Sequence, residues 1–382
     1  MDYWRLWTSS ASSNLADGVL KVALPLAALG LTRSPSLIAG LAFAFTVPWL
    51  LFALPAGVLA DRYDRRKLML AANLARAALL GVLVVAVTAG AGSIAFLYVV
   101  AFAVGTAETV HDTAAQSIVP QLVPRERLPK ANGRLYAAEL TANELAGPPL
   151  AGFLVAAGVT IALVTPGALW IFAVAALALV RGSFRVKVPP ATIRADIAEG
   201  VRFLARDRVL RSFTVVVGVF NFASSASQAI LVLYAVGPMR LSEQGYGWLL
   251  STFAAGSLAG SFLAGRAGPR ALPVSLAFGA IAVGIPALTT NPYVAGAGFF
   301  LGGAGLIVAN VLTVSLRQSL TPAHLLGRVN SSHRLVAFGT KPLGALAGGV
   351  LAQFLGLRPV FAVMGLLALA VIPVVVRAPC PE

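Results

Sequence analysis

Charged residues are scarce in this sequence, and their scarcity limits what the protein can be. Asp, Glu, Lys and Arg together make up 11% of the 382 residues, whereas a soluble domain carries about 25%. Hydrophobic residues make up 58% and recur in long runs from one end of the chain to the other. The composition therefore excludes an ordinary soluble domain and indicates an integral membrane protein that crosses the bilayer many times.

Residues that usually carry redox, metal or nucleophilic chemistry are also few. The single cysteine, Cys380, excludes an internal disulfide. The three histidines, His111, His324 and His333, are far apart, and the sequence contains no Cys/His cluster, glycine-rich phosphate loop or nucleophile elbow. We therefore expect no enzymatic activity, no metal and no cofactor.

Acidic residues are outnumbered by basic ones, 14 to 29, which gives a formal net charge of +15. Such an excess can indicate nucleic-acid binding, but here the basic residues gather in short connections between apolar runs. Lys and Arg collect in this way in the cytoplasmic loops of membrane proteins. The partner that the charge predicts is therefore the lipid bilayer, with no role for nucleic acid.

Apolar segments of about 20 residues, the length that crosses a bilayer, predict twelve spanning helices. The first residues, MDYWRLW, lack the pattern of a cleaved signal peptide, so the first span is expected to remain. The predicted spans lie near residues 8–31, 36–59, 68–90, 93–117, 133–157, 160–180, 210–237, 244–265, 272–289, 292–316, 331–355 and 357–376.

A long connection, residues 181–209, divides the chain into a bundle of six spans in 1–180 and a second in 210–382. After a Pro189-Pro190 break, apolar residues at helical spacing fall on one face of this connection and charged residues on the other. This pattern predicts a cytoplasmic linker whose amphipathic helix lies on the inner membrane surface.

The distribution of basic residues predicts the orientation. If both termini are cytoplasmic, the outer loops hold only Arg33, Arg240 and Arg358, and most other Lys and Arg residues lie on the inner side. The positive-inside rule favours this arrangement. We therefore expect a multi-pass protein of the cell membrane with both termini in the cytoplasm. Three basic residues fall within predicted spans: Lys21, Arg76 and Lys341.

The two halves resemble each other in sequence. LADRYDRR (59–66) aligns with LAGRAGPR (263–270), and VPRERLPKAN, which ends at Asn132, parallels TPAHLLGRVN, which ends at Asn330. Each matched pair has the same predicted sidedness, as expected for parallel repeats about an axis along the membrane normal.

The segment GVLADRYDRRKLML (57–70), between the second and third predicted spans, resembles the loop signature of the major facilitator superfamily. Asp64 stands where that signature usually has glycine. The resemblance implies an all-α membrane protein with two six-helix bundles around a central cavity, which transports by alternating access. The matching residues are Gly57, Leu59, Ala60, Asp61, Arg62, Arg65 and Arg66.

Two functions compete for this loop. In the family it holds the cytoplasmic gate shut, and Asp61 could cap a helix N-terminus across the two halves, while Gly57 would permit close helix packing. Alternatively, the basic residues only fix orientation. We favour the latch for Asp61. The gate residues implied are Gly57, Asp61, Arg62, Arg65, Arg66, Arg266 and Arg270.

Other stretches are similar to one branch of the superfamily, the secretion-effector group that includes siderophore exporters. They are residues 131–152, 321–332 and 341–349. Within the first, NELAGPPLAG partly matches the antiporter motif of the superfamily, although two positions, Asn143 and Ala151, replace glycines. This similarity implies export. The motif residues are Asn143, Gly147, Pro148 and Gly152.

Ionisable residues inside predicted spans need a partner or a function, because a charge that faces lipid costs at least about 2.5 kcal/mol near the bilayer centre. Glu108, His111 and Asp112 share one helical face of the fourth span. The other candidates are Asp17 and Lys21 in the first span, and Glu139 and Glu144 in the fifth.

Such charges either exchange protons or fix helix register. Asp17 and Lys21 lie one turn apart with opposite signs, so they are expected to pair. Glu108 and Asp112 have like signs, which pairing within the helix does not explain. We expect Glu108 to be the main coupling carboxylate, since it lies nearer the predicted midplane. Many proton-coupled members of the superfamily carry an Arg in the fourth span, whereas 93–117 has none, so a relay here must be built differently.

The sequence thus predicts a secondary active transporter, a proton-coupled exporter of small hydrophobic or amphipathic compounds. Small apolar residues with mainly acidic charges suit hydrophobic, cationic substrates, and also a hydrophobic natural product. The alternatives are an importer of a small metabolite, either proton-coupled or facilitative, and a non-transporting membrane receptor or scaffold. Its partners would be a small-molecule substrate, protons and lipid, and we expect a monomer.

Overall fold

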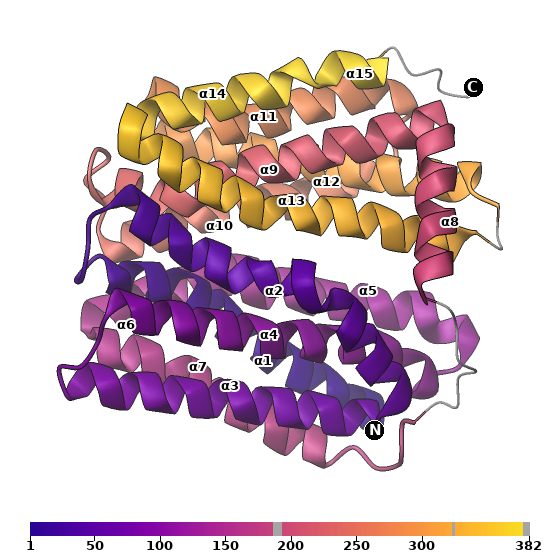
Figure 1. Cartoon of the computed structure of the whole chain (residues 1–382), viewed down its shortest axis with the longest axis horizontal. Helices are drawn as coiled ribbons and strands as arrows, with labels where there is room; N and C mark the ends of the chain where they lie inside the picture. The colour runs from indigo at the N-terminus through magenta and orange to yellow at the C-terminus, as the bar shows by residue number, and fades with distance from the viewer. Residues whose placement is uncertain (186–192, 323–324, 377–382) are drawn as a thin grey trace. The chain divides into compact units, whose positions relative to one another are not determined.

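The computed structural model describes residues 1–185, 193–322 and 325–376, and all regular structure among them is helical (Figure 1). Helix covers most of each of the twelve predicted ranges. The elements are α1 Asp2–Ala28, α2 Pro35–Arg62, α3 Arg65–Thr88, α4 Ile94–Ile118, η1 Val119–Gln121, η2 Arg125–Arg127, α5 Leu128–Glu139, η3 Leu140–Ala146, α6 Gly147–Ala157, α7 Val159–Ala178, α8 Ile193–Arg206, α9 Arg208–Val236, α10 Glu243–Ala264, η4 Pro269–Ala271, α11 Leu272–Leu288, α12 Pro292–Leu320, α13 Leu326–Leu355, α14 Leu357–Ala370 and α15 Ile372–Val376.

Nine helices in the described part of the chain are long and apolar enough to cross a membrane. The other three predicted spans correspond to α1, to the segment α5–η3–α6, and to α11. Each has a physical reason to fall short: α1 is rich in polar residues, the α5–η3–α6 segment changes helix type twice, and α11 has 17 residues.

Helix α1 is polar because it is covered by protein rather than by lipid. Ser9 and Ser12 donate hydrogen bonds of 2.8 Å and 2.9 Å to the carbonyls of Ala173 and Leu169 in α7. Hydroxyls between closely packed spanning helices typically find such carbonyl partners. This packing places the polar face of α1 inside its own group of helices.

The segment α5–η3–α6 is one predicted span with a seven-residue π-helix, Leu140–Ala146, in its middle. Single π turns inside α-helices are frequently found at functional sites. Pro149 has no N–H to donate to the carbonyl of Leu145, and Oγ of Ser251 in α10 donates to that carbonyl at 2.8 Å. The interruption is therefore stabilised by a neighbouring helix.

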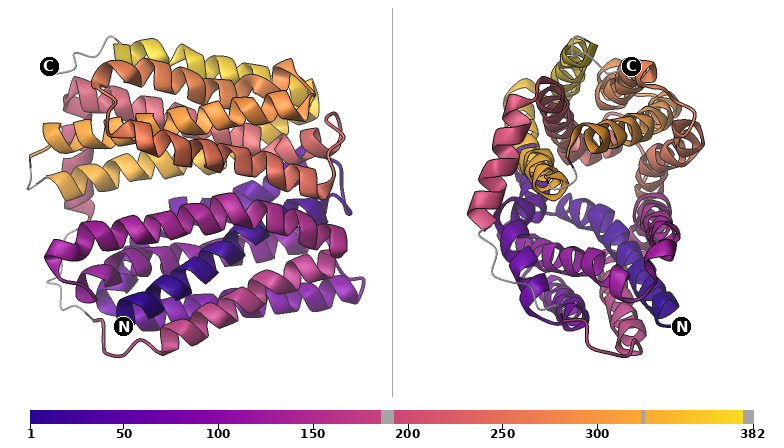
Figure 2. Two further views of the ribbon diagram at one scale, coloured as in Figure 1. Left: turned by 180° about the vertical axis from the view of Figure 1, so that it is seen from behind. Right: turned by 90° about the vertical axis from the view of Figure 1, so that its right-hand side faces the viewer.

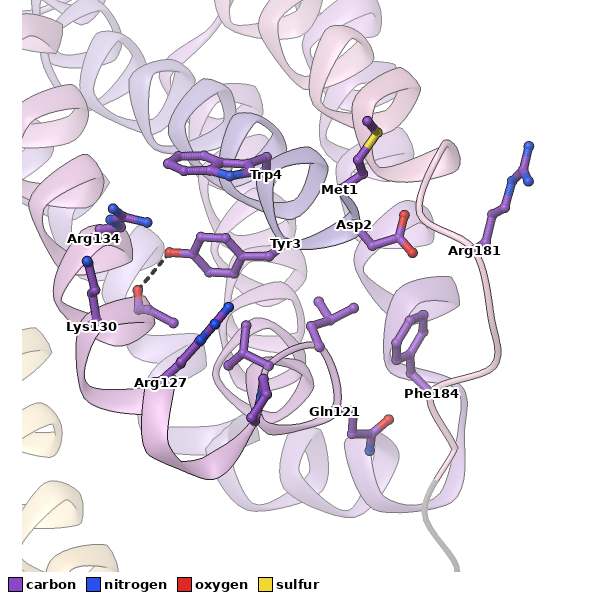
Figure 3. Close-up of a pocket in the computed structure, with 14 residues that line it drawn as sticks. Met1, Asp2, Tyr3, Trp4, Gln121, Arg127, Lys130, Arg134, Arg181 and Phe184 are labelled. Atoms are coloured by element: carbon purple, nitrogen blue, oxygen red, sulfur yellow. Dashed lines mark hydrogen bonds between the residues drawn. The ribbon is translucent and has the colours of Figure 1, made fainter.

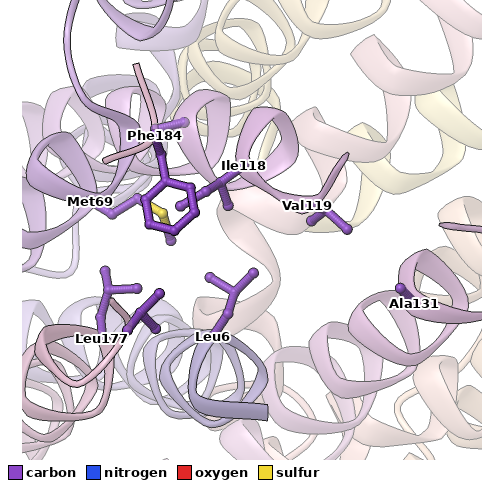
Figure 4. Close-up of a cluster of buried hydrophobic side chains, with 9 residues drawn as sticks. Leu6, Met69, Ile118, Val119, Ala131, Leu177 and Phe184 are labelled. Atoms are coloured by element: carbon purple, nitrogen blue, oxygen red, sulfur yellow. The ribbon is translucent and has the colours of Figure 1, made fainter. Parts of the chain in front are cut away.

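The chain forms two compact units. The first comprises Met1–Arg33, Ala44–Pro189 and Leu241–Ser251, so it includes the start of α10. At one end of this unit, a buried apolar cluster joins the start of α1 to the ends of α4 and α7 (Figure 4). Its labelled members include Leu6, Met69, Ile118, Leu177 and Phe184.

The second unit comprises Ser34–Phe43, Pro190–Arg240 and Thr252–Glu382. Figure 2 shows its helices from two further directions. Helix α8 falls within the predicted linker, residues 181–209, and it packs against α13. Leu204 is buried against Leu210 and Val329, so protein covers part of the face predicted to meet the membrane. The predicted Pro189-Pro190 break lies outside the described residues.

Candidate functional site

The predicted triplet lies on α4, whose start is capped by Ser93: its Oγ accepts a 3.2 Å hydrogen bond from the Phe96 N–H. Oε2 of Glu108 is buried and has no hydrogen-bond partner among the described residues. Nδ1 of His111 lies 3.1 Å from Oδ1 of Asp112. His111 is 2% exposed, whereas the Asp112 side chain is 38% exposed. Within the triplet, solvent exposure therefore increases from the buried carboxyl oxygen of Glu108 to the partly exposed side chain of Asp112.

A buried ion pair joins α1 to α3. Nη1 of Arg76 donates to Oδ1 of Asp17 at 2.8 Å, and Nη2 donates to Oγ of Ser13 at 3.1 Å and also to Oδ1 of Asn73. The guanidinium stacks 4.9 Å from the ring centroid of Trp170 in α7. The Arg76 side chain is 0% exposed, and these contacts satisfy Nη1 and Nη2, while its buried Nε has no hydrogen-bond partner among the described residues.

Sequence reasoning assigns Arg76 no role, although a lone arginine inside an apolar span is itself a signal of function or of a buried partner. The expected pairing of Asp17 with Lys21 is wrong. Asp17 pairs with Arg76, while Nζ of Lys21 pairs at 2.6 Å with Oε1 of Glu144 in η3. The reason is geometric: each residue has an opposite charge on a neighbouring helix that it reaches directly.

The structure brings most of the predicted ionisable residues into one cluster within the first unit. Glu108 lies within electrostatic range of the carboxylates of Asp17 and Asp112 and of the cations Arg76 and Lys21. Glu139, which is exposed, joins the same cluster through Asp112, Glu144 and Asp17. We call these groups on α1, α3, α4, α5 and η3 the charge cluster: Asp17, Lys21, Arg76, Glu108, His111, Asp112, Glu139 and Glu144.

The basic residues of the loop signature bind helix ends within the first unit. Nη1 of Arg65 donates at 2.7 Å to the carbonyl of Ser117, near the end of α4. Arg66 donates through Nε and Nη2 to the carbonyls of Leu177 and Ala178, at 3.1 Å and 2.5 Å, where α7 ends. Cations at helix C-termini satisfy free carbonyls and complement the helix dipole. Arg65 and Arg66 therefore stabilise helix ends, in addition to any effect that their charges have on the orientation of the protein in the membrane.

Asp64, the residue that departs from the loop signature, caps the start of α3. Its Oδ1 accepts hydrogen bonds from the backbone N–H of Arg66 and of Lys67, and its Oδ2 accepts from Oγ of Ser183 and from the N–H of Phe184. Partial burial raises the pKa of this carboxyl, but these four hydrogen bonds together hold the pKa below its usual value. Asp64 thus attaches residues 183–184 to the loop.

Three other residues of the loop, Gly57, Asp61 and Arg62, behave differently from Arg65 and Arg66. The Asp61 side chain is 53% exposed, and its carboxylate lies 3.8 Å from Nη2 of Arg65. A β-carbon on Gly57 would meet nothing within 4 Å among the described atoms, so the first unit alone does not supply the close packing expected at Gly57. Arg62 is exposed like Asp61. In the second copy, Arg266 bonds only to its own helix, at the carbonyl of Phe262, among the contacts described, and Arg270 is exposed.

The antiporter-like segment forms close backbone contacts. A β-carbon on Gly147 would lie 2.7 Å from Cα of Gly18 in α1, and one on Gly152 would lie 2.8 Å from Cα of Gln244 in α10. Pro148 is buried beside Gly147, and its carbonyl contacts Gly247. Oδ1 of Asn143 is buried without a hydrogen-bond partner in the described part of the chain. The glycines therefore let η3 and α6 approach α1 and α10 backbone to backbone.

No group of three or more His, Cys, Asp or Glu side chains among the described residues is arranged to hold a metal ion. What the charge cluster can do chemically is bind and release protons, because it combines an unpartnered buried carboxyl oxygen with a partly exposed carboxylate on the same helix face.

The profile of the transmembrane secretion effector family matches residues 2–382. The chain belongs to this family. It is 29% identical to the multidrug efflux pump Tap of Mycobacterium tuberculosis, over 95% of this chain and 90% of that protein. It is 24% identical to the macrolide efflux protein A of Streptococcus pyogenes, over 97% and 94% of the two chains.

The fold of this secretion-effector protein is that of major facilitator transporters. A crystal structure of a mutant of the nucleoside transporter NupG superposes with a TM-score of 0.81 at 10% identity, over 98% of this chain and 99% of the other. The family match confirms the resemblance drawn from residues 57–70, and it makes the protein a multi-pass membrane transporter.

Proposed function

We propose that this transporter is a proton-coupled exporter of small hydrophobic or amphipathic compounds. Proton coupling is supported mainly by Glu108 in the charge cluster, whose carboxyl oxygen Oε2 is buried and has no hydrogen-bond partner among the described residues. Export is supported by the similarity to proteins named for macrolide and multidrug efflux. The proposal includes twelve spans in two bundles, residues 1–180 and 210–382, with a cytoplasmic linker at 181–209 and both termini in the cytoplasm.

Glu108 is the proposed proton carrier because its neighbours already have other partners. Arg76 neutralises Asp17, and Lys21 pairs with Glu144, so these four charges stabilise contacts among α1, α3 and η3. Glu108 lacks such a partner at Oε2. Its deprotonated form adds a negative charge beside Asp17 and Asp112, so protonation relieves repulsion in the cluster.

Asp112 and His111 form the proposed route between Glu108 and water. They lie one turn from Glu108, at the end of the triplet where the Asp112 side chain is partly exposed. His111 contacts Asp112 through Nδ1, and its Nε2 is buried and without a partner in the described part of the chain. A histidine in this position can accept a proton at one nitrogen and release it from the other. Glu139, which is exposed in the same cluster, is the alternative carrier.

The loop signature supplies the proposed cytoplasmic gate. Arg65 and Arg66 anchor the loop to α4 and α7, which leaves the exposed side chains of Asp61 and Arg62 available for a latch. We therefore propose that Asp61→Asn abolishes transport while expression stays near normal. Unchanged transport in Asp61→Asn would remove the latch from the mechanism.

Flux through the purified protein tests the function. Proteoliposomes with an imposed pH gradient would be given macrolides and lipophilic cations such as ethidium, and the movement of each compound and of protons would be followed. The proposal expects compound movement opposite to proton movement, abolished by dissipating the gradient. Movement in the same direction as protons would indicate an importer, and the absence of flux for every compound would favour a receptor or scaffold.

A further inference from the structure

A cavity at one end of the first unit is lined by no residue of the charge cluster and by no residue of the loop signature. Its volume is about 500 Å³, and it lies where α1 and α5 begin and where the connection after α7 passes (Figure 3). The lining carries four basic side chains and one acidic side chain, Asp2. Asp2 is already paired with Arg5 at 2.8 Å, so the cavity presents a net positive charge.

Three of the basic side chains gather around two aromatic rings. Arg127, Lys130 and Arg134 extend from η2 and α5 toward Tyr3 and Trp4, whereas the fourth, Arg181, lies on the other side of the cavity (Figure 3). The aromatic rings are held in place. The Tyr3 hydroxyl donates at 2.9 Å to the carbonyl of Ala131, and the Arg134 guanidinium stacks 5.0 Å from the Trp4 ring centroid.

These three charged groups have no neutralising carboxylate in the described part of the chain, although the Arg134 guanidinium stacks on Trp4. Arg127, Lys130 and Arg134 are exposed, and within the described part of the chain none of them forms an ion pair. Several cations held around one cavity, without carboxylates to neutralise them, repel one another and favour an anion between them. The amphipathic rings of Tyr3 and Trp4 suit the headgroup level of a membrane, where one edge meets apolar chains and the other meets water.

We propose that this cavity binds a phosphate group through Arg127 and Lys130, with Arg134 held by Trp4 as the third cation. Because the cavity lies at the ends of the helices, we favour a lipid as the source of this phosphate group. It would be the headgroup of an anionic phospholipid such as phosphatidylglycerol. A soluble phosphate monoester offers the same chemistry, so the experiment includes both. This site is independent of the proton-coupling proposal, since none of its residues belongs to the charge cluster.

The test uses the full-length protein in zwitterionic phosphatidylcholine nanodiscs, with binding measured by native mass spectrometry and by thermal shift. One arm adds phosphatidylglycerol, and the second adds glycerol 3-phosphate. The variant is Arg127→Gln/Lys130→Gln. The matched control is Lys67→Gln/Arg125→Gln, which removes the same charge from exposed positions that do not line the cavity.

Loss of two cations should weaken binding roughly 25-fold, while the control stays near wild type. Such a loss in the lipid arm supports the proposal with a lipid as the source, and a loss in the soluble arm alone supports it with a soluble phosphate. Equal binding by the variant and the control would overturn it, as would binding of neither ligand by the wild type.

Discussion

Arg76 of α3 donates a 2.8 Å hydrogen bond to Asp17 of α1, and both side chains are buried. The pair connects two helices of the first unit beside the carboxyl group of Glu108. Removing one partner of a buried pair leaves the other charge without compensation, which costs more than replacing both. The pair therefore fixes the position of α1 against α3, and it lies beside the carboxyl group that we propose as the proton carrier.

Arg76→Gln is expected to destabilise the protein by about 3–5 kcal/mol, because the Asp17 carboxylate stays buried without its partner. Asp17→Asn should have an effect of the same sign. The double variant should lose less than the sum of the two, and a double-mutant cycle of unfolding in detergent measures the difference. Strictly additive losses would show that the two side chains do not stabilise each other.

Asp64 should make stability depend on pH. Its pKa is held below the usual value in the folded protein, so its contribution is present above the unfolded pKa of about 3.9 and declines as pH falls through the folded pKa. Asp64→Asn should cost about 1 kcal/mol at neutral pH, because the amide nitrogen cannot accept the hydrogen bonds that Oδ2 accepts from Ser183 and Phe184. Thermal unfolding of wild type and variant between pH 7 and pH 3 should converge at the acidic end. A difference that stays constant with pH would show that the charge of Asp64 plays no part.

Substitution by alanine should have opposite effects on stability at two glycines of the sequence motifs, Gly147 and Gly57. Gly147→Ala places a methyl group 2.7 Å from Cα of Gly18, so it should reduce folding yield and transport. Gly57→Ala adds a methyl group in open space within helix α2, and it should stabilise the helix by up to about 1 kcal/mol. Fluorescence-detected size-exclusion chromatography after heating compares the two variants. Equal heat resistance would contradict the backbone contact between α1 and α6.

The helices could be predicted from the sequence because apolar runs long enough to span a bilayer are a direct consequence of lipid contact. The partners of buried charges could not be predicted in the same way. Asp17 and Lys21 lie one turn apart, but each faces a different neighbouring helix, and only tertiary packing places Arg76 and Glu144 beside them. The role of Asp64 was hidden for a similar reason, since residues 183–184 approach it from far along the chain.

The π-helix at Leu140–Ala146 also had no clear signal in the sequence. The segment reads as one continuous span, and the glycines and prolines indicate bending without specifying its form. The deciding contacts come from Ser251, which bonds the carbonyl of Leu145, and from Gly18, which lies against Gly147. Both belong to helices distant in sequence, so local patterns could not contain them.

The most direct test of proton coupling is the proton flux into proteoliposomes that accompanies substrate transport, compared between wild type and Glu108→Gln. The variant keeps the size of the side chain and fixes it in a neutral form, and Glu126→Gln serves as a matched control at an exposed loop carboxylate. Our account predicts that Glu108→Gln loses both proton flux and transport driven by the pH gradient, retains substrate counterflow, and that the control behaves as wild type. Full proton flux in Glu108→Gln would contradict the account and leave the charge cluster as a structural element.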